Sequence, residues 1–423
     1  MAPSGRNHDG LLARVNFPLY TLQMLTSRHV LVAGGGGMSK TGVANGFEVY
    51  ELYHNGERFM AEEVIRHETG TSVVMNCSVI SNPKGNYLAV GQESHCQLYS
   101  ISPKIIDLAE WKIEQTNLAR RRKNSERAHD DNHHAENDYN REGFRKMTFE
   151  IQAQDSIQTD FTPEEPLQRV IKISHCAKLM ATGGTDGHIR VWKFPKLIKK
   201  LDISAHSKEL DDIDFSPNDK LIVSVAKDGL GIVWCAETGQ KKISLKWNQP
   251  EGTKYLFKRC KFGIIEGEKD KCRLFTIANP AGRAGKQKGF LHQWDVDQNV
   301  VTKTVAIEES LSALAVRDDG RFLAIGTMFS GTVSVYVAFS MHRVLYVPGA
   351  HSMFVTGLEF LPLKGKGPPV SSDSEAAVLS ISVDNRVCIH SLPYRHTLPA
   401  WIAILIIVFM LFLTFTFCSY LGL

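Results

Sequence analysis

The chain has 423 residues, of which 43% are hydrophobic and 22% charged, and its formal net charge is +4. So small a charge does not provide the concentrated basic face that nucleic-acid binding requires, and we expect no nucleic-acid partner. Eight cysteines are scattered without CxxC pairs or metal-ligand spacing, which indicates reduced thiols and excludes a zinc site. The opening MAPSGRNHDG has no apolar run typical of a signal peptide.

The first predicted elements follow a polar N-terminal tail, residues 1–16. From residue 17 to Leu52, apolar strands flank a glycine-rich segment, residues 33–46, which reads AGGGGMSKTGVANG. Another stretch with the order strand, turn and strand ends at Tyr99. A small sheet of this kind cannot bury both of its faces alone, so each stretch predicts one unit of a repeat structure.

Three interpretations of the glycine-rich segment compete. A phosphate-binding loop is rejected because its pattern needs glycine where Ser39 stands and a helix afterwards, whereas a strand follows here. A flexible hairpin loop is the second, since a glycine run permits any backbone conformation. The third is an ordered loop whose carbonyls hold a monovalent cation, or whose backbone lies against a partner. The residues alone leave the second and third open.

Residues 103–155 do not fit the repeat. Its middle, residues 119–146, is rich in charge and nearly lacks large apolar residues, so we expect a disordered excursion between the second and third blades. Its basic part, Arg120 to Lys123, matches a nucleic-acid or nuclear-import pattern, but runs of mixed charge are usually solvated surface.

The clearest repeats are residues 175–192 and 210–234. Each has an apolar strand, an Asp-Gly turn and a strand that closes on tryptophan. The two tryptophans are about 42 residues apart, within the roughly 40 to 45 residues of a WD-type propeller blade. With weaker copies before and after them, they predict an all-β, seven-bladed propeller over residues 17–395, closing near Leu52, Tyr99, Trp192, Trp234, Trp294, Tyr336 and His390.

Several polar residues of the repeats are expected to be structural. Ala205-His206 and Ala350-His351 resemble the Gly-His dipeptide that opens WD repeats. Together with the Asp-Gly turns and closing tryptophans, they predict a hydrogen-bond network within the blades and no catalytic role. The predicted scaffold residues are Asp186, Trp192, His206, Asp228 and Trp234.

The C-terminal segment predicts a membrane anchor. Residues 400–418 contain no charge, and a bilayer core needs about 20 apolar residues of helix. Trp401 and Tyr420 supply aromatic side chains at the two ends. Arg395 and His396 precede the span, so the positive-inside rule places the large domain in the cytosol and residues 419–423 in the lumen.

Several motifs together resemble those of the animal members of the endoplasmic reticulum guanine nucleotide exchange factor family, which acts on the Sar-type GTPase of the COPII coat. The resemblance extends over nearly the whole chain. It rests on FPLY (17–20), AGGGG…KTG…NG (33–46), GQESHCQL (91–98), QTDF (158–161), ATGGTDGHIRVWK (181–193) and the C-terminal span.

The resemblance implies a propeller on the cytosolic face of the endoplasmic reticulum membrane that exchanges GDP for GTP on the Sar-type GTPase, without covalent catalysis and without binding nucleotide itself. It further implies that a first-blade loop, stabilised by potassium, contacts the GTPase. Lys40 is expected to pair with an acidic group of the GTPase. By position the exchange loop contains Gly34, Gly35, Gly36, Gly37, Met38, Ser39, Lys40, Thr41, Gly42, Asn45 and Gly46; the candidate potassium ligands are Gly34, Gly35, Gly36, Ser39, Thr41 and Asn45.

Two alternatives come from other classes of function. The family includes members named for binding a promoter element, so a transcriptional regulator is one, although the predicted anchor and the lack of a DNA-reading helix disfavour it. A propeller scaffold without exchange activity is the other. COPII coat or exit-site scaffold proteins are further candidate partners, and the glycine-rich loop distinguishes exchange from scaffolding.

Overall fold

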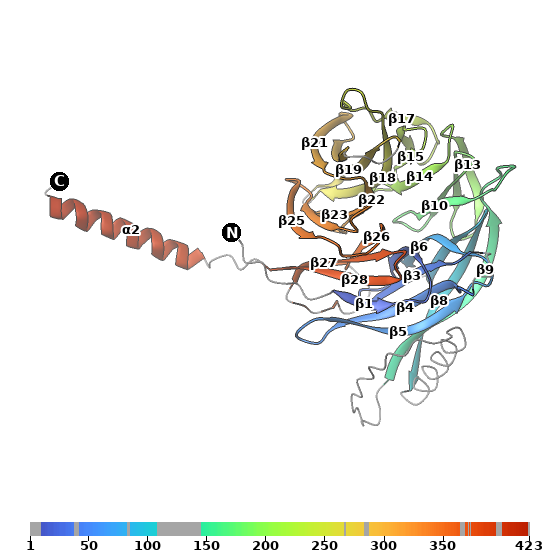
Figure 1. The fold of residues 1–423 in the computed structure, drawn as a ribbon, viewed down its shortest axis with the longest axis horizontal. Helices are drawn as coiled ribbons and strands as arrows, with labels where there is room; N and C mark the ends of the chain where they lie inside the picture. Colours follow the sequence, from blue (N-terminus) through green and yellow to red (C-terminus); the bar gives the residue numbers. More distant parts are fainter. Residues whose placement is uncertain are drawn as a thin grey trace.

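The computed structural model describes residues 10–37, 42–82, 85–107, 145–265, 268–282, 287–363, 369–370, 372, 374–394 and 400–421. These residues form seven four-stranded antiparallel sheets and one helix, α2 (Ala400–Leu421). The first strand of each sheet contacts the first strand of the next, and the seventh contacts the first, so the sheets close into a ring (Figure 1). The predicted seven-bladed propeller is confirmed.

The first four blades follow the chain from inner to outer strand. Blade 1 contains β2 (Leu19–Met24), β3 (His29–Gly35), β4 (Asn45–His54) and β5 (Phe59–Glu68). Blade 2 contains β6 (Val74–Asn82), β7 (Gly85–Gln92), β8 (His95–Asp107) and β9 (Arg145–Gln158). Blade 3 contains β10 (Gln168–Ile173), β11 (Leu179–Gly184), β12 (His188–Lys193) and β13 (Ile198–Ser204). Blade 4 contains β14 (Leu210–Phe215), β15 (Leu221–Ala226), β16 (Gly231–Cys235) and β17 (Lys241–Ser244).

The last three blades repeat this order, except that the chain's first strand completes blade 7. Blade 5 contains β18 (Tyr255–Ile265), β19 (Glu268–Pro280), β20 (Gly289–Asp295) and β21 (Val300–Ile307). Blade 6 contains β22 (Leu311–Val316), β23 (Phe322–Thr327), β24 (Val333–Val337) and β25 (His342–Val347). Blade 7 contains β26 (Val355–Phe360), β27 (Ser374–Ser382), β28 (Arg386–Pro393) and β1 (Leu11–Arg14).

The outer strands are the least buried strands of the blades. Every residue of β14 is buried, whereas β21 alternates between exposed and half-buried residues, as expected for an edge strand with one solvated face. The third strand of each blade carries its predicted closing residue; Trp192, Trp234 and Trp294 are buried there against the neighbouring blade. Packing between blades therefore hides the apolar faces that a single blade would expose.

The N-terminal segment is partly structural, which corrects the expectation of a tail over residues 1–16. Strand β1 pairs antiparallel with β28, with Leu11 opposite Cys388 and Arg14 opposite Arg386. The amide of Val15 donates to the carbonyl of Asn385 at 2.9 Å. The seventh blade thus takes its outer strand from the start of the chain, so both ends of the propeller sequence are needed to close the ring.

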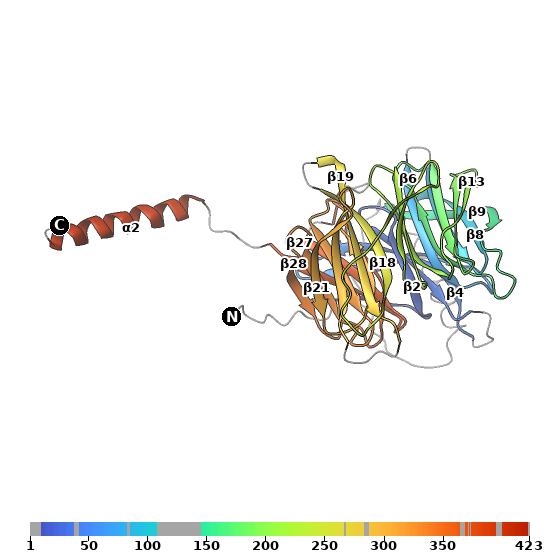
Figure 2. The same ribbon diagram turned by 90° about the horizontal axis from the view of Figure 1, so that it is seen from above.

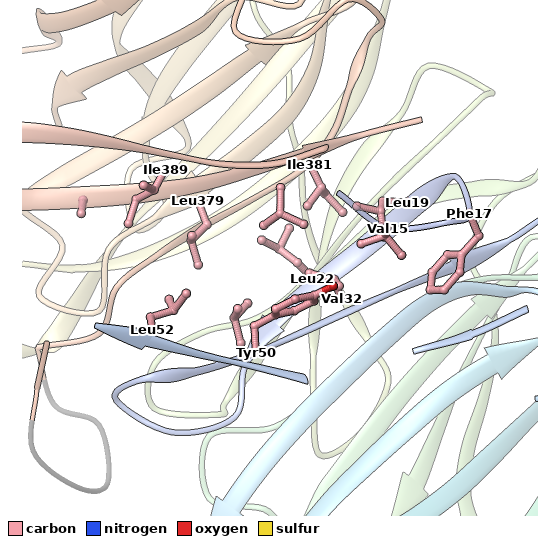
Figure 3. Packing of buried hydrophobic residues seen from close by; sticks show 13 residues of the cluster. Val15, Phe17, Leu19, Leu22, Val32, Tyr50, Leu52, Leu379, Ile381 and Ile389 are labelled. Atoms are coloured by element: carbon pink, nitrogen blue, oxygen red, sulfur yellow. The ribbon is translucent and has the colours of Figure 1, made fainter. Parts of the chain in front are cut away.

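A buried cluster joins blades 1 and 7 at this closure (Figure 3). Phe17 and Leu19 lead into blade 1, Tyr50 and Leu52 come from its third strand, and the side chains of blade 7 include Leu379. Phe17 and Leu19 are each at most 1% exposed. The FPLY motif therefore contributes directly to the core that seals the ring.

The charged insertion lies within blade 2 and is shorter than expected. Residues 103–107 belong to β8 and residues 145–155 to β9, and these two strands pair with each other from Asp107 and Arg145 inward. The insertion therefore connects the third and fourth strands of one blade and does not separate two blades. Residues 108–144, including Arg120 to Lys123, lie outside the described residues.

Helix α2 stands apart from the ring in both views (Figures 1 and 2). It begins at Ala400, as expected, and continues to Leu421, so it includes residues 419–421 of the predicted tail. Its segment Ile404–Leu421 has a mean hydropathy of 2.5 and none of it is buried. By length and composition it is the one candidate membrane span among the residues described.

Candidate functional site

The glycine-rich segment joins β3 to β4, the second and third strands of blade 1. Because successive strands of each blade are antiparallel, all connections between second and third strands lie on one face of the ring, together with the connections between blades. We call this the loop face. Gly34 and Gly35 end β3, Asn45 and Gly46 begin β4, and Met38, Ser39, Lys40 and Thr41 lie outside the described residues.

Gly34 and Gly35 are buried strand residues. Gly34 pairs with Leu19 of β2 on one side and with Gly46 of β4 on the other. A Cβ atom on Gly34 would lie 1.9 Å from the carbonyl oxygen of Pro18, and one on Gly35 would lie 2.1 Å from Oδ1 of Asn45. Gly35 also has a φ of 146°. Close backbone packing therefore requires glycine at both positions.

This location changes the expected role of the glycines. A backbone paired on both edges is not available to wrap around an ion, so Gly34 and Gly35 are poorer candidate ligands than the sequence indicated. Gly46 is buried as well: its Cβ would lie 2.2 Å from the carbonyl oxygen of His67. Gly37 and Gly42 instead lie in open space with φ near 79° and 77°, so they shape the projecting part of the loop.

Asn45 fastens the base of the loop. Its side chain is 4% exposed. Its Oδ1 accepts from the amide of Gly37 at 2.9 Å, and its Nδ2 donates to the carbonyls of Gly37 at 3.2 Å and Gly70 at 3.0 Å. One carboxamide thus joins the two sides of the loop and the connection that leads from blade 1 to blade 2. We call this set of contacts the Asn45 clamp.

The residues that support the clamp were missed at the sequence level. The carbonyl of Pro18 accepts from the amide of Gly35 at 3.0 Å, and the carbonyl of Asn45 accepts from Thr69 at 3.0 Å. The ring of His67 stacks on Phe47 at 4.9 Å, and burial lowers the His67 pKa. A neutral, tightly packed floor therefore lies under the loop.

The oxygen atoms at the loop base are uncharged. They are Oδ1 of Asn45 and backbone carbonyls such as those of Gly37 and Gly70. In the part of the chain that the structure describes, no group of three or more His, Cys, Asp or Glu side chains could hold a metal. Neutral oxygens suit a weakly held monovalent cation better than a divalent metal, which prefers carboxylates.

The predicted scaffold residues of blade 4 are joined by hydrogen bonds. Nδ1 of His206 lies 3.0 Å from Asp228, Nε2 of His206 lies 2.8 Å from the Ser224 hydroxyl, and Nε1 of Trp234 donates to that hydroxyl at 2.9 Å. Burial lowers the His206 pKa while Asp228 raises it. This series of hydrogen bonds links the connection between blades 3 and 4 to the second and third strands of blade 4, which is a structural role.

Blade 7 has the same series of hydrogen bonds with one change. His351 bridges Asp384 at 3.1 Å and Ser380 at 2.7 Å, and His390 replaces tryptophan as the partner of Ser380 at 2.9 Å. The sequence had identified His351 and His390, but Ser380 and Asp384 were missed.

Blade 3 uses a different arrangement. Nε1 of Trp192 donates to Thr182 at 2.9 Å, but Asp186 pairs with Arg190 at 2.7 Å. Arg190 is buried and also donates to the carbonyl of Thr159 at 2.7 Å. Asp186 therefore fixes the Asp-Gly turn through arginine, where the corresponding aspartates of blades 4 and 7 pair with histidine.

Together, these observations define a WD-repeat propeller protein with one candidate membrane span, at its C-terminal end, among the residues that the structure describes. The family model described as "WD domain, G-beta repeat" matches residues 168–193 and 196–235. These ranges are most of blade 3 and blade 4.

Similarity to individual proteins extends over nearly the full chain. The chain is 35% identical to guanine nucleotide-exchange factor SEC12 of Mus musculus and 34% identical to that of Rattus norvegicus, each match covering 97% of both chains. SEC12-like protein 1 of Arabidopsis thaliana is 26% identical over 51% of this chain and 52% of its own length. The chain belongs to the SEC12 guanine nucleotide-exchange factor family.

Proposed function

We propose that the chain exchanges nucleotide on a Sar-type small GTPase at the endoplasmic reticulum membrane, and so starts COPII vesicle formation. The family supports the exchange activity, and α2 supports membrane attachment. The observation that carries the assignment of the site is the Asn45 clamp, which joins the two ends of the glycine-rich connection to the connection between blades 1 and 2. A loop of this kind is suited to contact a partner.

Exchange requires differential binding and no covalent chemistry. A factor that binds the nucleotide-free GTPase more tightly than the GDP form weakens GDP binding by the same factor, because the two binding free energies are linked. A loop that is already ordered loses less conformational entropy when it binds, so more of its contact energy is available to displace the nucleotide. The clamp therefore provides what an exchange loop needs.

Potassium would fit the projecting part of the loop. The carbonyls of Gly36 and Gly37, with oxygens of Ser39 and Thr41, would hold it, and Asn45 would position these groups from below. Bound there, potassium would supply further order to a segment rich in glycine. Lys40 remains the candidate for an ion pair with an acidic group of the GTPase.

The orientation of the chain follows from the anchor. Arg395 and His396 precede α2, and the positive-inside rule then places the propeller in the cytosol, where the GTPase and its nucleotides are found. Attachment to the endoplasmic reticulum would restrict GTPase activation to that membrane.

The decisive experiment replaces the projecting part of the loop. The replacement is limited to residues 37–44, because Gly34, Gly35, Asn45 and Gly46 belong to paired strands. A Gly-Ser turn in place of residues 37–44 should abolish the acceleration of GDP release from the Sar-type GTPase while the thermal unfolding of the propeller stays nearly unchanged.

The matched control replaces residues 55–58, the connection between β4 and β5 on the opposite face of the same blade. This control should retain exchange activity. Full activity of the 37–44 replacement would refute the loop assignment. Lack of exchange activity in the wild-type protein would leave a scaffold function in its place.

A further inference from the structure

The propeller has a second face whose position relative to the membrane is restricted by the chain itself. Strand β28 is the third strand of blade 7, so its C-terminal end lies on the face opposite the loop face. This anchor face carries the connections between first and second strands and between third and fourth strands. The chain leaves it at Tyr394, and α2 begins at Ala400.

The connection between the end of the propeller at Tyr394 and the start of α2 at Ala400 is short. Six residue steps separate Tyr394 from Ala400, and an extended chain covers at most about 3.6 Å per residue, so the connection reaches about 20 Å. If α2 spans the bilayer, the part of the anchor face around the end of β28 must lie within about that distance of the membrane surface. Side chains near this exit are therefore close to lipid headgroups.

A groove lies beside the exit. Its volume is about 490 Å³, and its walls come from blades 5, 6 and 7, with Leu392 of β28 among the lining residues. Phe339 lies at the edge of this groove, in the turn between β24 and β25, and is 66% exposed. That turn is held in place because the amide of Ala338 donates to the carbonyl of Arg321 at 2.8 Å. We call this feature the anchor-side groove.

Cationic side chains surround the exposed ring. Lys303 lies 4.7 Å and Arg273 5.3 Å from the centre of the Phe339 ring, and Nζ of Lys303 donates to the Phe339 carbonyl at 2.7 Å. Arg321 also lines the groove, with 48% of its side chain exposed, and pairs with Glu375 at 3.3 Å. Three cations and one carboxylate thus lie around the groove.

Two nearby carboxylates on the same face have partners in the protein. Asp319 pairs with Arg317, and Asp295 accepts from the amides of Asp297 and Gln298 at 3.0 and 3.1 Å. Cations beside an exposed aromatic ring are the combination that membrane interfaces favour, because the ring enters the headgroup layer while guanidinium groups bind phosphate.

We propose that the anchor-side groove binds the headgroup of an anionic phospholipid in the membrane that holds α2. Blades 5 to 7 then rest against the bilayer, and the short connection keeps them there. Arg273 and Arg321 bind the lipid phosphate, Lys303 adds to the attraction, and Phe339 enters the headgroup layer. The proposal rests on α2 as a membrane anchor and is independent of the GTPase.

The affinity is tested with the propeller alone, residues 1–394. The seven sheets close without α2, and none of the α2 span is buried against them, so this part folds by itself. It should float with vesicles of phosphatidylcholine containing 20% phosphatidylinositol 4-phosphate, and not with pure phosphatidylcholine, and binding should decrease with salt. Equal binding to both vesicles, or none to either, would overturn the proposal.

The residues are tested with paired variants. Phe339→Ser with Arg321→Glu should weaken vesicle binding about tenfold or more, since each basic residue near an anionic surface contributes a several-fold factor. Arg273→Gln with Lys303→Gln provides a second, milder pair. The matched control is Phe329→Ser with Lys208→Glu on the loop face, where both side chains are also exposed. Equal losses in control and groove variants would refute the groove.

The orientation is tested with the full chain in nanodiscs that contain a phosphoinositide with a photoreactive headgroup. Crosslinks should map to residues 317–322 and 336–343 of the anchor face, and not to residues 328–332 on the loop face of the same blade. Crosslinks confined to the loop face, or spread equally over both faces, would contradict the proposal even if the propeller binds vesicles in solution.

Discussion

The Asn45 clamp makes a quantitative prediction. Asn45→Ala removes three hydrogen bonds, two to Gly37 and one to Gly70. Each neutral hydrogen bond contributes about 0.5–1.5 kcal/mol. Gly37 is only half-buried and Gly70 is exposed, so water can replace part of what is lost, and we expect a cost near the lower end, about 1–2 kcal/mol.

This cost acts on the loop more than on the whole propeller. The clamp orders a connection outside the strand ladders, so the melting temperature should decrease by only a few degrees. If the ordered loop is the form that binds the GTPase, and order and disorder are nearly balanced, a cost of about 1–2 kcal/mol lowers the ordered population about three- to fifteenfold. Exchange activity should then fall by the same factor, about three- to fifteenfold.

The assay is the release of a fluorescent GDP analogue from the Sar-type GTPase at limiting concentrations of the propeller. Asn55→Ala is the matched control: its Oδ1 accepts from the amides of Glu57 at 3.0 Å and Arg58 at 2.9 Å, in the turn of blade 1 on the opposite face. Wild-type exchange by Asn45→Ala, or an equal loss in Asn55→Ala, would refute the role of the clamp.

Three further predictions concern the ion, the scaffold and the Glu359 carboxyl on the inner strand β26. Exchange should fall several-fold when potassium is replaced by tetramethylammonium at equal ionic strength, because oxygen cages select by size; equal rates would exclude the ion. His206→Ala should lower the free energy of unfolding in urea by about 2–4 kcal/mol, since Asp228 and Ser224 lose their buried partner. A change under about 0.5 kcal/mol, which is the size of a typical surface substitution, would contradict this. Burial raises the pKa of Glu359 to about 7, so the folded state binds a proton more tightly than the unfolded chain. The free energy of unfolding should therefore fall from pH 4.5 to 7. Glu359→Gln should stabilise the protein by up to about 3 kcal/mol at pH 8 but not at pH 5, which urea midpoints would reveal.

The blades could be predicted because their signal is local. Trp192 and Trp234 close strands at blade spacing, and each fills the space between its own blade and the neighbouring one. Strand β1 could not be predicted in the same way. It has four residues, and its partner β28 lies at the other end of the propeller sequence, so no local pattern reports the pairing.

The insertion was misjudged for a related reason. The outer parts of β8 and β9 pair with each other, yet many of their residues are exposed, so their sequence has the polar character of a disordered segment. Strand pairing satisfies the backbone there, and only a few side chains, such as Ile106 and Phe149, are buried. Composition reports burial, and it does not report backbone pairing.

The glycine-rich segment shows most directly what a local sequence pattern does not predict. A glycine run is typical of a loop, and the connection between β3 and β4 is one. Gly34 and Gly35 are nevertheless strand residues, required because Pro18 and Asn45 approach too closely for a side chain. The role of Asn45 depends on Gly70, which lies 25 residues away in another connection. Both contacts arise only when the blade has folded.

The fold separates exchange from attachment. The glycine-rich loop lies on the loop face, and the chain leaves for α2 from the anchor face. Strand β4 has 10 residues, so at about 3.3 Å per residue roughly 30 Å lies between the two faces. If the GTPase binds at this loop, the membrane cannot form part of the surface that meets it, and the contribution of the membrane is to fix where exchange occurs.

A last prediction follows from this separation. Removing residues 395–423 should leave the rate of GDP release in solution unchanged, because no part of the clamp depends on α2, while the recruitment of GTP-loaded GTPase to reconstituted endoplasmic reticulum vesicles should be lost. Rates measured with the propeller in solution and with the full chain in nanodiscs would decide. A rate in solution more than about tenfold lower, equivalent to about 1.4 kcal/mol, would mean that the bilayer supports the exchange loop directly.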